Sequence, residues 1–189
     1  MKEIEEKVLK DGEIIGKDII KVDCFLNHQI DIKTLKKFAI EVRKEFKNVK
    51  IDKVLTIETS GIAVGYAVAE AFGDLPLLFA KKAKSKIING DLFSTKIKSF
   101  TRDEMCDVTV NKKYLKAGEN ILIVDDFLAE GNAGIGLIDL CHQAGANPVG
   151  LAVFIEKYFQ GGHQKIEAMG VKVVAGASIK AFKNNKPIF

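Results

Sequence analysis

The sequence contains few cysteines and no long hydrophobic segment, and each absence excludes a class of protein. Its three cysteines, Cys24, Cys106 and Cys141, are far apart and form no CxxC or Cys/His pattern, so we expect neither a disulfide framework nor a zinc site. The longest apolar runs fall far short of the ~20 residues that a membrane-spanning helix needs. The N-terminal segment MKEIEEKVLK is too acidic for a signal peptide, so we expect a cytoplasmic protein that does not enter a membrane.

Two widespread phosphate-binding signatures are also missing. The chain has neither the GxxxxGK[ST] pattern of a Walker A loop nor GxGxxG after its first strand. The net charge of +4 comes mainly from scattered lysines, with one local group at Lys81, Lys82, Lys84 and Lys86. This group has no interleaved aromatic residues, so it favours a small polyanion over nucleic acid as its partner.

What is present is typical of a single globular domain. Hydrophobic residues make up 47% of the chain and charged residues 29%, a balance that disordered segments do not show. A chain of 189 residues is long enough to bury about 70% of the surface that its unfolded form would expose. No repeat, low-complexity tract or linker divides it, so we expect one domain over residues 1–189.

Apolar runs alternate with helical patterns along most of the chain. After the possible N-cap Asp31, apolar residues recur at helical spacing at Ile32, Leu35, Phe38, Ala39, Val42 and Phe46. Further on, the pattern predicts strands at 53–57, 76–80, 120–124, 149–155 and 172–175, and helices at 62–72, 133–144 and 162–169. Buried strands that alternate with helices indicate an α/β fold with a parallel, doubly wound sheet. Ligands of such sheets bind beyond the carboxyl ends of the strands.

The alternation is interrupted between residues 81 and 115. Lys96 to Thr101 and Cys106 to Val110 resemble two short strands around the polar turn 102–104. We therefore predict a β-hairpin excursion, mobile over about 84–115 and placed to close over the binding site.

The segment from Ile121 to Leu140 carries the strongest functional signal. A buried strand leads into Asp125 and Asp126, a turn of small residues, and a helix start. A phosphate binds well at a helix N-terminus, because free backbone N–H groups point at it and the helix dipole favours negative charge. Small side chains in the turn allow close approach, and the two carboxylates can accept hydrogen bonds from the vicinal hydroxyls of a sugar.

The run from Val124 to Ala133, VDDFLAEGNA, resembles the ribose-5-phosphate loop of type I phosphoribosyltransferases. Segments 21–29, 57–62, 79–82 and 155–160 extend the resemblance over nearly the whole chain, to the bacterial xanthine branch of the purine enzymes. The resemblance implies a mainly parallel sheet flanked by helices, with a small hood formed largely by about residues 1–30 and the C-terminal part. It also implies a homodimer that transfers the phosphoribosyl group of phosphoribosyl pyrophosphate to N9 of xanthine, in purine salvage.

The resemblance implies roles for individual residues. Asp125 and Asp126 are the expected catalytic pair. The residues expected to bind phosphoribosyl pyrophosphate are Ala129, Glu130, Gly131, Asn132, Ala133, Ser60, Gly61 and Lys81. Those expected to bind xanthine are Ile20, Asn27, Lys157 and Phe159. Lys157 would donate to the 6-oxo group and Asn27 to the 2-oxo group, with Ile20 or Phe159 over the purine face.

The same resemblance implies Mg²⁺, carried mainly by the phosphoribosyl pyrophosphate. The ion can bind substrate oxygens and reach protein carboxylates through waters, so no residue is expected to be a direct metal ligand. Related enzymes also hold their pyrophosphate turn through a non-proline cis peptide, expected here near Thr59-Ser60.

The loop departs from the broader family pattern, which often ends Thr-Gly-Gly-Thr. The corresponding residues here are Glu130, Gly131, Asn132 and Ala133. Ala133 has no hydroxyl to offer a phosphate, and Glu130 must point away from it because like charges would oppose binding. The three histidines, His28, His142 and His163, belong to no motif that would make one a general base.

Two alternatives remain open at this point. Guanine, hypoxanthine or adenine transfer would use the same sugar loop with a different base pocket. Some proteins of this fold instead sense phosphoribosyl pyrophosphate and regulate transcription through an added N-terminal DNA-binding domain. Only about thirty residues precede the first clear core helix, too few for such a domain.

Overall fold

A mainly parallel sheet forms the centre of the protein. The computed structural model describes residues 1–16, 18–83, 91–98 and 105–189. Its seven-stranded sheet has the order β5-β6-β4-β3-β7-β8-β9. The strands are β3 (Lys53–Ile57), β4 (Leu77–Ala83), β5 (Leu92–Lys98), β6 (Met105–Asn111), β7 (Asn120–Leu128), β8 (Asn147–Lys157) and β9 (Val173–Ile179). The pairs from β4 through β3, β7 and β8 to β9 are parallel, which confirms the predicted α/β sheet.

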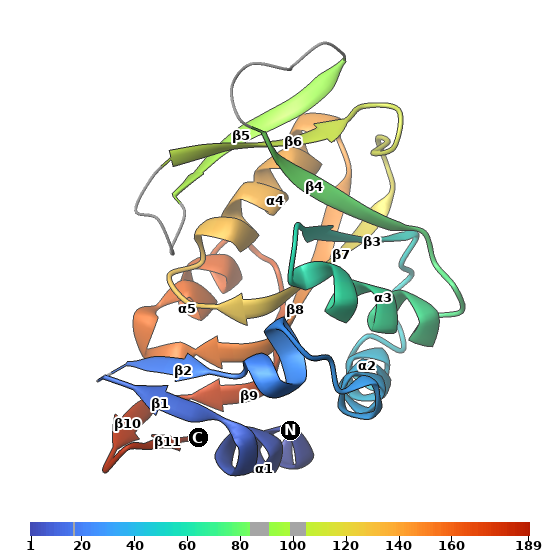
Figure 1. Ribbon diagram of the computed structural model, residues 1–189. Helices are drawn as coiled ribbons and strands as arrows, with labels where there is room; N and C mark the ends of the chain where they lie inside the picture. The colour runs from blue at the N-terminus through green and yellow to red at the C-terminus, as the bar shows by residue number, and fades with distance from the viewer. Residues whose placement is uncertain (17, 84–90, 99–104) are drawn as a thin grey trace.

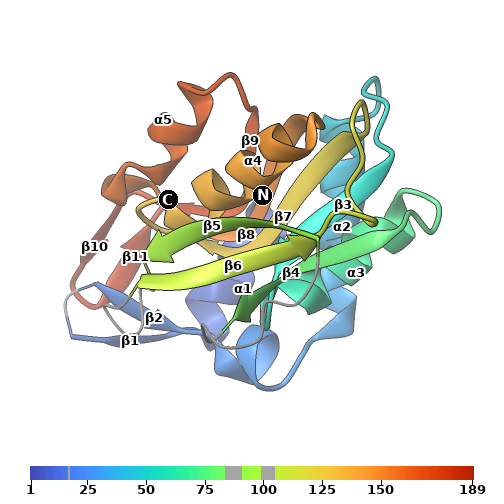
Figure 2. The ribbon, with the colours of Figure 1, turned by 90° about the horizontal axis from the view of Figure 1, so that it is seen from above.

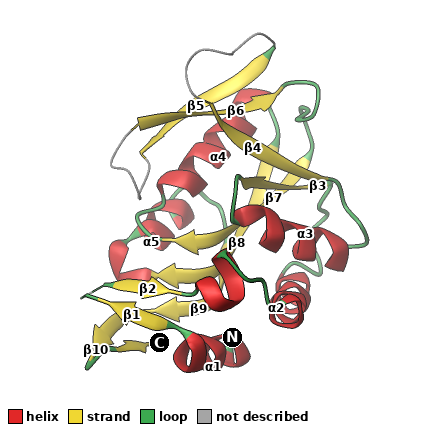
Figure 3. Ribbon diagram, in the orientation of Figure 1, coloured by secondary structure: helices red, strands yellow, loops and turns green. Residues whose placement is uncertain are grey.

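Helices cover both faces of this sheet (Figure 3). On one face, α1 (Lys2–Asp11), α2 (Ile32–Glu45) and α3 (Gly61–Ala71) form a core with alternate residues of β7, including Leu122 and Val124. On the other face, α4 (Asn132–Ala144) and α5 (Gly162–Glu167) pack against Ile121 and Ile123. This two-sided burial explains why β7 is a continuous apolar run in the sequence.

The helix predicted after Asp31 is present, with one correction. Asp31 caps α2 by accepting a hydrogen bond from the Thr34 N–H at 3.1 Å. Leu35, Phe38, Ala39 and Val42 are buried as expected. Ile32 was placed on the same apolar side but is 65% exposed, because the first turn of α2 extends beyond the edge of the core.

Among the described residues, none of the helices combines the length and apolarity that crossing a bilayer requires.

The strand that carries the carboxylates is longer than the sequence indicated. β7 continues to Leu128, because Phe127 and Leu128 still pair with Ile155 and Glu156 of β8. Asp125 and Asp126 therefore lie within the strand and not after it. The predicted helix at 133–144 begins one residue earlier, at Asn132.

Small elements gather near the two chain ends, around β9 (Figure 1). They are the antiparallel hairpins β1 (Glu13–Ile15) with β2 (Ile19–Lys21) and β10 (Ala181–Lys183) with β11 (Lys186–Ile188), the single-turn π-helix η1 (Asp23–Asn27) and the 3₁₀ turn η2 (Tyr158–Gln160). The sequence analysis did not predict these short elements or α1.

The predicted excursion is a hairpin of β5 and β6, which extends the sheet beyond β4 in antiparallel fashion. The hairpin packs on α4, as Figures 1 and 2 show. A Cβ at Gly136 would lie 2.6 Å from Cγ1 of Ile97, and Gln143 Nε2 donates to the Ser94 carbonyl at 2.9 Å. The expected turn at 102–104, the end of the first predicted strand, and Lys84 and Lys86 of the lysine group lie outside the described residues.

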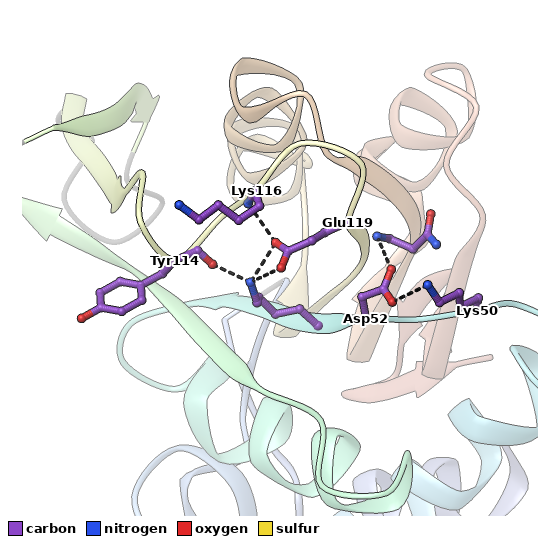
Figure 4. A network of polar contacts seen from close by, with 7 residues as sticks. Lys50, Asp52, Tyr114, Lys116 and Glu119 are labelled. Carbon is purple, nitrogen blue, oxygen red and sulfur yellow. Dashed lines mark hydrogen bonds and ion pairs between the residues drawn. The ribbon is translucent and has the colours of Figure 1, made fainter.

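A polar network ties the chain together at the amino ends of β3 and β7 (Figure 4). Lys53 Nζ donates to both carboxylate oxygens of Glu119 at 2.8 Å and to the Tyr114 carbonyl at 2.5 Å. Asp52 accepts a hydrogen bond from the Asn120 N–H at 2.9 Å, which is the largest cause of its lowered pKa. These bonds hold the segment after β6 at the amino ends of the parallel strands. The candidate site lies at the other end of the sheet, beyond the carboxyl ends of the strands.

Candidate active site

A cavity of about 410 Å³ opens at the carboxyl ends of the parallel strands. This volume falls within the range of small-molecule sites. Of the residues selected from the sequence, ten line the cavity: Ile20, Asn27, Ser60, Asp125, Asp126, Ala129, Gly131, Asn132, Ala133 and Lys157. The fold therefore brings together residues that are up to 137 positions apart in the sequence (Ile20 to Lys157).

Asp125 and Asp126 lie at the floor of the cavity. Asp125 is only 7% exposed, and its carboxylate accepts a hydrogen bond from the Asp126 N–H at 2.9 Å. Burial raises the pKa of Asp125 well above its usual range, the Asp126 charge raises it further, and Lys82 acts in the opposite direction.

Gly61 makes room for this carboxylate. A Cβ at Gly61 would clash with the Thr56 hydroxyl oxygen and lie 2.8 Å from Oδ1 of Asp125. Gly61 itself is buried beneath the cavity wall and does not line it. Its small size therefore matters for the packing of the turn onto β7.

The N-terminal segment reaches the carboxylates through Asn27. This residue is the last of the π-helical turn η1, and its Nδ2 donates to Oδ2 of Asp126 at 2.5 Å. Single π-helical turns are rare and occur often at functional sites. Ile19 and Ile20 of β2 line the cavity beside Asn27.

We name the turn before α4, residues 129–133, the anion cup, because its geometry suits an anion. Gly131 adopts a left-handed conformation with φ of 91°, and α4 begins after it without a side-chain cap. The backbone of the first helical turn is thus available to an anion at the cavity wall, where Ala129, Gly131, Asn132, Ala133 and Gly134 are exposed to the cavity. Glu130 is outside the lining, and its Oε2 accepts from Asn132 Nδ2 at 3.4 Å.

The turn between β3 and α3 also contributes residues to the cavity lining. Glu58 and Ser60 line the cavity, and the peptide bond between Glu58 and Thr59 is cis. The sequence analysis placed a non-proline cis bond near Thr59-Ser60, one bond later. Glu58 Oε1 also accepts the Lys82 N–H at 2.7 Å, which joins this turn to β4.

The two lysines of β4 point differently. Lys82 lines the cavity, whereas Lys81, the residue selected from the sequence, places its Nζ 6.0 Å from the centre of the Phe79 ring and is not among the lining residues. Successive residues of a strand face opposite sides. Lys82 is therefore the lysine of this pair that the structure places at the cavity.

Lys157 is the last residue of β8 and lines the cavity. It is 5% exposed, and burial lowers its pKa while the Asp18 charge acts against that shift. Phe159 was expected beside it, but its ring is 44% exposed and packs edge-on against Phe182 at a centroid distance of 5.9 Å. The structure thus brings Ile20 to the cavity and leaves Phe159 outside its lining.

Several lining residues were missed by the sequence analysis. They are Ile19, Ile57, Glu58, Lys82, Ile97, Lys98, Cys106, Phe127, Leu128 and Gly134. Ile97, Lys98 and Cys106 come from the hairpin, whose sequence signals a strand pair but not the side that faces the site. Phe127 directly follows the two carboxylates, and a predicted strand that continued to residue 128 would have included it.

The arrangement suits an anionic sugar substrate. The anion cup, two carboxylates and two lysines, Lys82 and Lys157, line one cavity. The described residues contain no group of three histidine, cysteine or acidic side chains able to hold a metal ion.

Comparisons with known proteins all match the chain to phosphoribosyltransferases. Residues 21–182 match the phosphoribosyl transferase domain family. Xanthine phosphoribosyltransferase of Clostridioides difficile is 47% identical over 184 residues, 97% of each chain. Xanthine phosphoribosyltransferase 1 of Clostridium perfringens is 46% identical over 189 residues, the whole of each chain. Adenine phosphoribosyltransferase of Rhodothermus marinus has a similar structure, with a TM-score of 0.75 at 20% identity, covering 95% of this chain and 100% of that chain.

Proposed function

Because the chain belongs to the phosphoribosyltransferase family, we propose that it transfers the 5-phosphoribosyl group of phosphoribosyl pyrophosphate to N9 of xanthine. The C1–N9 bond forms, the C1–pyrophosphate bond breaks, and the N9 proton leaves, giving xanthosine 5'-monophosphate and pyrophosphate. The observation that carries the proposal is the joining of Asn27 and Lys157 to the anion cup and the carboxylates in one cavity. The full-length relatives named for xanthine support the choice of base.

The anion cup is suited to the 5-phosphate. Its backbone N–H groups at the start of α4 donate to phosphate oxygens, and the helix dipole adds favourable charge. Asp125 and Asp126 lie beside the cup, where they accept hydrogen bonds from the ribose hydroxyls and stabilise positive charge that develops at C1. Such positioning contributes about 7–11 kcal/mol in well-aligned reactions.

The leaving pyrophosphate is assigned to the turn at Ser60 and Gly61. Lys82 supplies positive charge at this wall, while the role first expected of Lys81 stays a prediction. Mg²⁺ would be carried by the phosphoribosyl pyrophosphate, and it would reach lining carboxylates such as Glu58 and Asp126 through waters. When bound with the substrate, the ion neutralises pyrophosphate charge; the residues named here orient the ribose and exclude water.

Base recognition rests on two donors at separate points of the cavity. Lys157 donates to the 6-oxo group, and Asn27 donates to the 2-oxo group that distinguishes xanthine from hypoxanthine. Ile20, which is 6% exposed, packs against the purine face. The described structure gives no histidine in the cavity lining, so the proposal uses no histidine base.

We further expect a cytoplasmic homodimer with a hood over the base end of the cavity. The hairpin β1–β2 and η1 contribute Ile19, Ile20 and Asn27 to the lining, which supports a hood built from the N-terminal residues. Large exposed rings at Tyr66 (64%) and Phe79 (37%) provide apolar surface for a second copy of the chain. Light scattering coupled to size-exclusion chromatography measures the oligomeric state.

One assay tests the proposed activity. Pyrophosphate release is measured with phosphoribosyl pyrophosphate, Mg²⁺ and each of xanthine, guanine, hypoxanthine and adenine. We expect the highest kcat/KM with xanthine. A higher value with another base would make the protein a different purine phosphoribosyltransferase, and tight binding of phosphoribosyl pyrophosphate without turnover of any base would favour a sensor.

A further inference from the structure

The loop that forms the anion cup is supported from behind by the start of α5. The Gly162 N–H donates to the Ala129 carbonyl at 3.1 Å, and Lys165 Nζ donates to the Glu130 carbonyl at 3.0 Å. Both acceptors are backbone groups of the loop itself. Their hydrogen bonds fix two consecutive peptide groups at the point where the chain leaves β7 and turns toward α4.

The contact between the two segments is close enough to require glycine on both sides. A Cβ at Gly162 would lie 2.6 Å from the Gly131 nitrogen and would clash with the Ala129 carbonyl. A Cβ at Gly131 would lie 3.1 Å from Cα of Gly162. Backbone therefore packs directly on backbone, and a small movement of α5 would be transmitted to the cup.

The short helix α5 is itself fixed in place. His163 Nδ1 lies 2.7 Å from Oε2 of Glu156, a side chain of β8 that is 2% exposed. Ile166 is fully buried and packs near Gly134 of α4, where a Cβ would lie 2.8 Å from Cδ1 of Ile166. A rigid support of this kind is what a precisely placed anion site requires.

We propose that Gly162 and Lys165 are positioning residues for the 5-phosphate loop. This inference rests on the proposed function. Neither residue belongs to the cavity lining, so each acts through the loop backbone. Loss of the Lys165 contact lets the Glu130 peptide group relax and misplaces the N–H groups that hold the phosphate.

The test compares Lys165→Met with Lys165→Arg and with the control Lys172→Met. Lys172 is a suitable control because its Nζ also donates to a backbone carbonyl, that of Glu45 at 3.1 Å, and pairs with the Glu45 carboxylate. It directly precedes β9 and does not line the cavity. For Lys165→Met we expect KM for phosphoribosyl pyrophosphate to rise about three- to tenfold, with kcat for xanthine changed less. Lys165→Arg should restore most of the loss, and Lys172→Met should show none.

A binding measurement separates this inference from the proposed function. Calorimetry should show that the dissociation constant for ribose 5-phosphate is about three- to tenfold larger for Lys165→Met than for wild type, at an unchanged Tm. Equal affinity in wild type and Lys165→Met overturns the positioning role even if the enzyme is active. If wild-type protein binds ribose 5-phosphate but releases no pyrophosphate with any base, the proposed function fails. The positioning role is then still decided by the affinities of wild type and Lys165→Met for ribose 5-phosphate.

Discussion

Asn27 donates a hydrogen bond to Asp126 over 2.5 Å, although the two residues are 99 positions apart in the chain. One is the proposed reader of the 2-oxo group of xanthine and the other a proposed acceptor for a ribose hydroxyl. The bond joins the N-terminal segment to the end of β7 across the cavity. Under the proposed roles, base selection and sugar binding would share this polar contact.

The first prediction concerns Asn27→Ala. We expect kcat/KM for xanthine to fall about 100-fold or more, because a site that loses a donor for a substrate oxygen discriminates poorly. The value for hypoxanthine, which has no 2-oxo group, should change far less. Asn147→Ala is a matched control, since the Asn147 side chain makes hydrogen bonds of 3.5 Å to Gly118 and 3.4 Å to Asn120 at the amino ends of β7 and β8. An unchanged ratio between the two bases would contradict the assignment.

The second prediction compares two neighbouring lysines. Lys82→Met should raise KM for phosphoribosyl pyrophosphate about tenfold, because Lys82 lines the cavity and a hydrogen bond to a charged group contributes more than a neutral one. Lys81→Met should change it less than about twofold, the effect typical of an exposed charge. Steady-state kinetics under identical Mg²⁺ concentrations measures both. A larger loss with Lys81→Met would support the lysine chosen from the sequence and reject the placement of Lys82.

The third prediction is a trade between activity and stability at Asp125. Its folded-state pKa is raised, chiefly by burial, so ionising it destabilises the folded protein as pH rises above the unfolded pKa and toward the raised folded value. Asp125→Asn removes this cost and keeps an oxygen for the Asp126 N–H. We expect Tm at pH 7 to rise by a few degrees, since about 1 kcal/mol corresponds to about 2–4 °C at this chain length. The kcat should fall about 100-fold.

Thermal unfolding of both proteins between pH 4 and pH 8 measures the stability part. The advantage of Asp125→Asn should grow with pH across this range. A variant that is less stable than wild type at pH 7 would show that the buried carboxylate stabilises the fold, and would reject the argument.

The sequence was sufficient for the central sheet and for half of the residues that line the cavity. Apolar runs such as Lys53–Ile57 end at polar turns, and β3 begins and ends at those residues. The small residues around Gly131 predicted a tight turn before α4 for a physical reason, because a left-handed turn and close backbone approach both require little side-chain volume. These features depend on local sequence, so they could be predicted.

Other features depend on partners far away in the chain. The extension of β7 to Leu128 requires pairing with β8, which no local pattern contains. The facing of Lys81 and Lys82 is set by the antiparallel pairing of β4 with β6. No local sequence pattern distinguishes the single π-helical turn that presents Asn27. Long-range pairing thus decided which of the candidate side chains reach the cavity.

The fourth prediction tests the cap of α2 through its pH dependence. Asp31 accepts hydrogen bonds from Lys7 and from Thr34, and its pKa is lowered to about 2, with the Lys7 contact the largest cause. A lowered folded pKa stabilises the fold above the unfolded value of 3.8, and this contribution is lost as pH falls toward 2. Asp31→Asn keeps a good capping residue but loses the ion pair and the titration.

Chemical denaturation at pH 2, 3, 4 and 7 measures this contribution. Wild type should be more stable than Asp31→Asn by about 1 kcal/mol at pH 7, a value discounted for partial solvent exposure, and the difference should disappear near pH 2. Lys7→Met should remove most of the same difference, because Lys7 Nζ lies 2.8 Å from Oδ2 of Asp31. A difference that persists unchanged at pH 2 would mean that capping geometry, and not charge, accounts for the effect of the substitution.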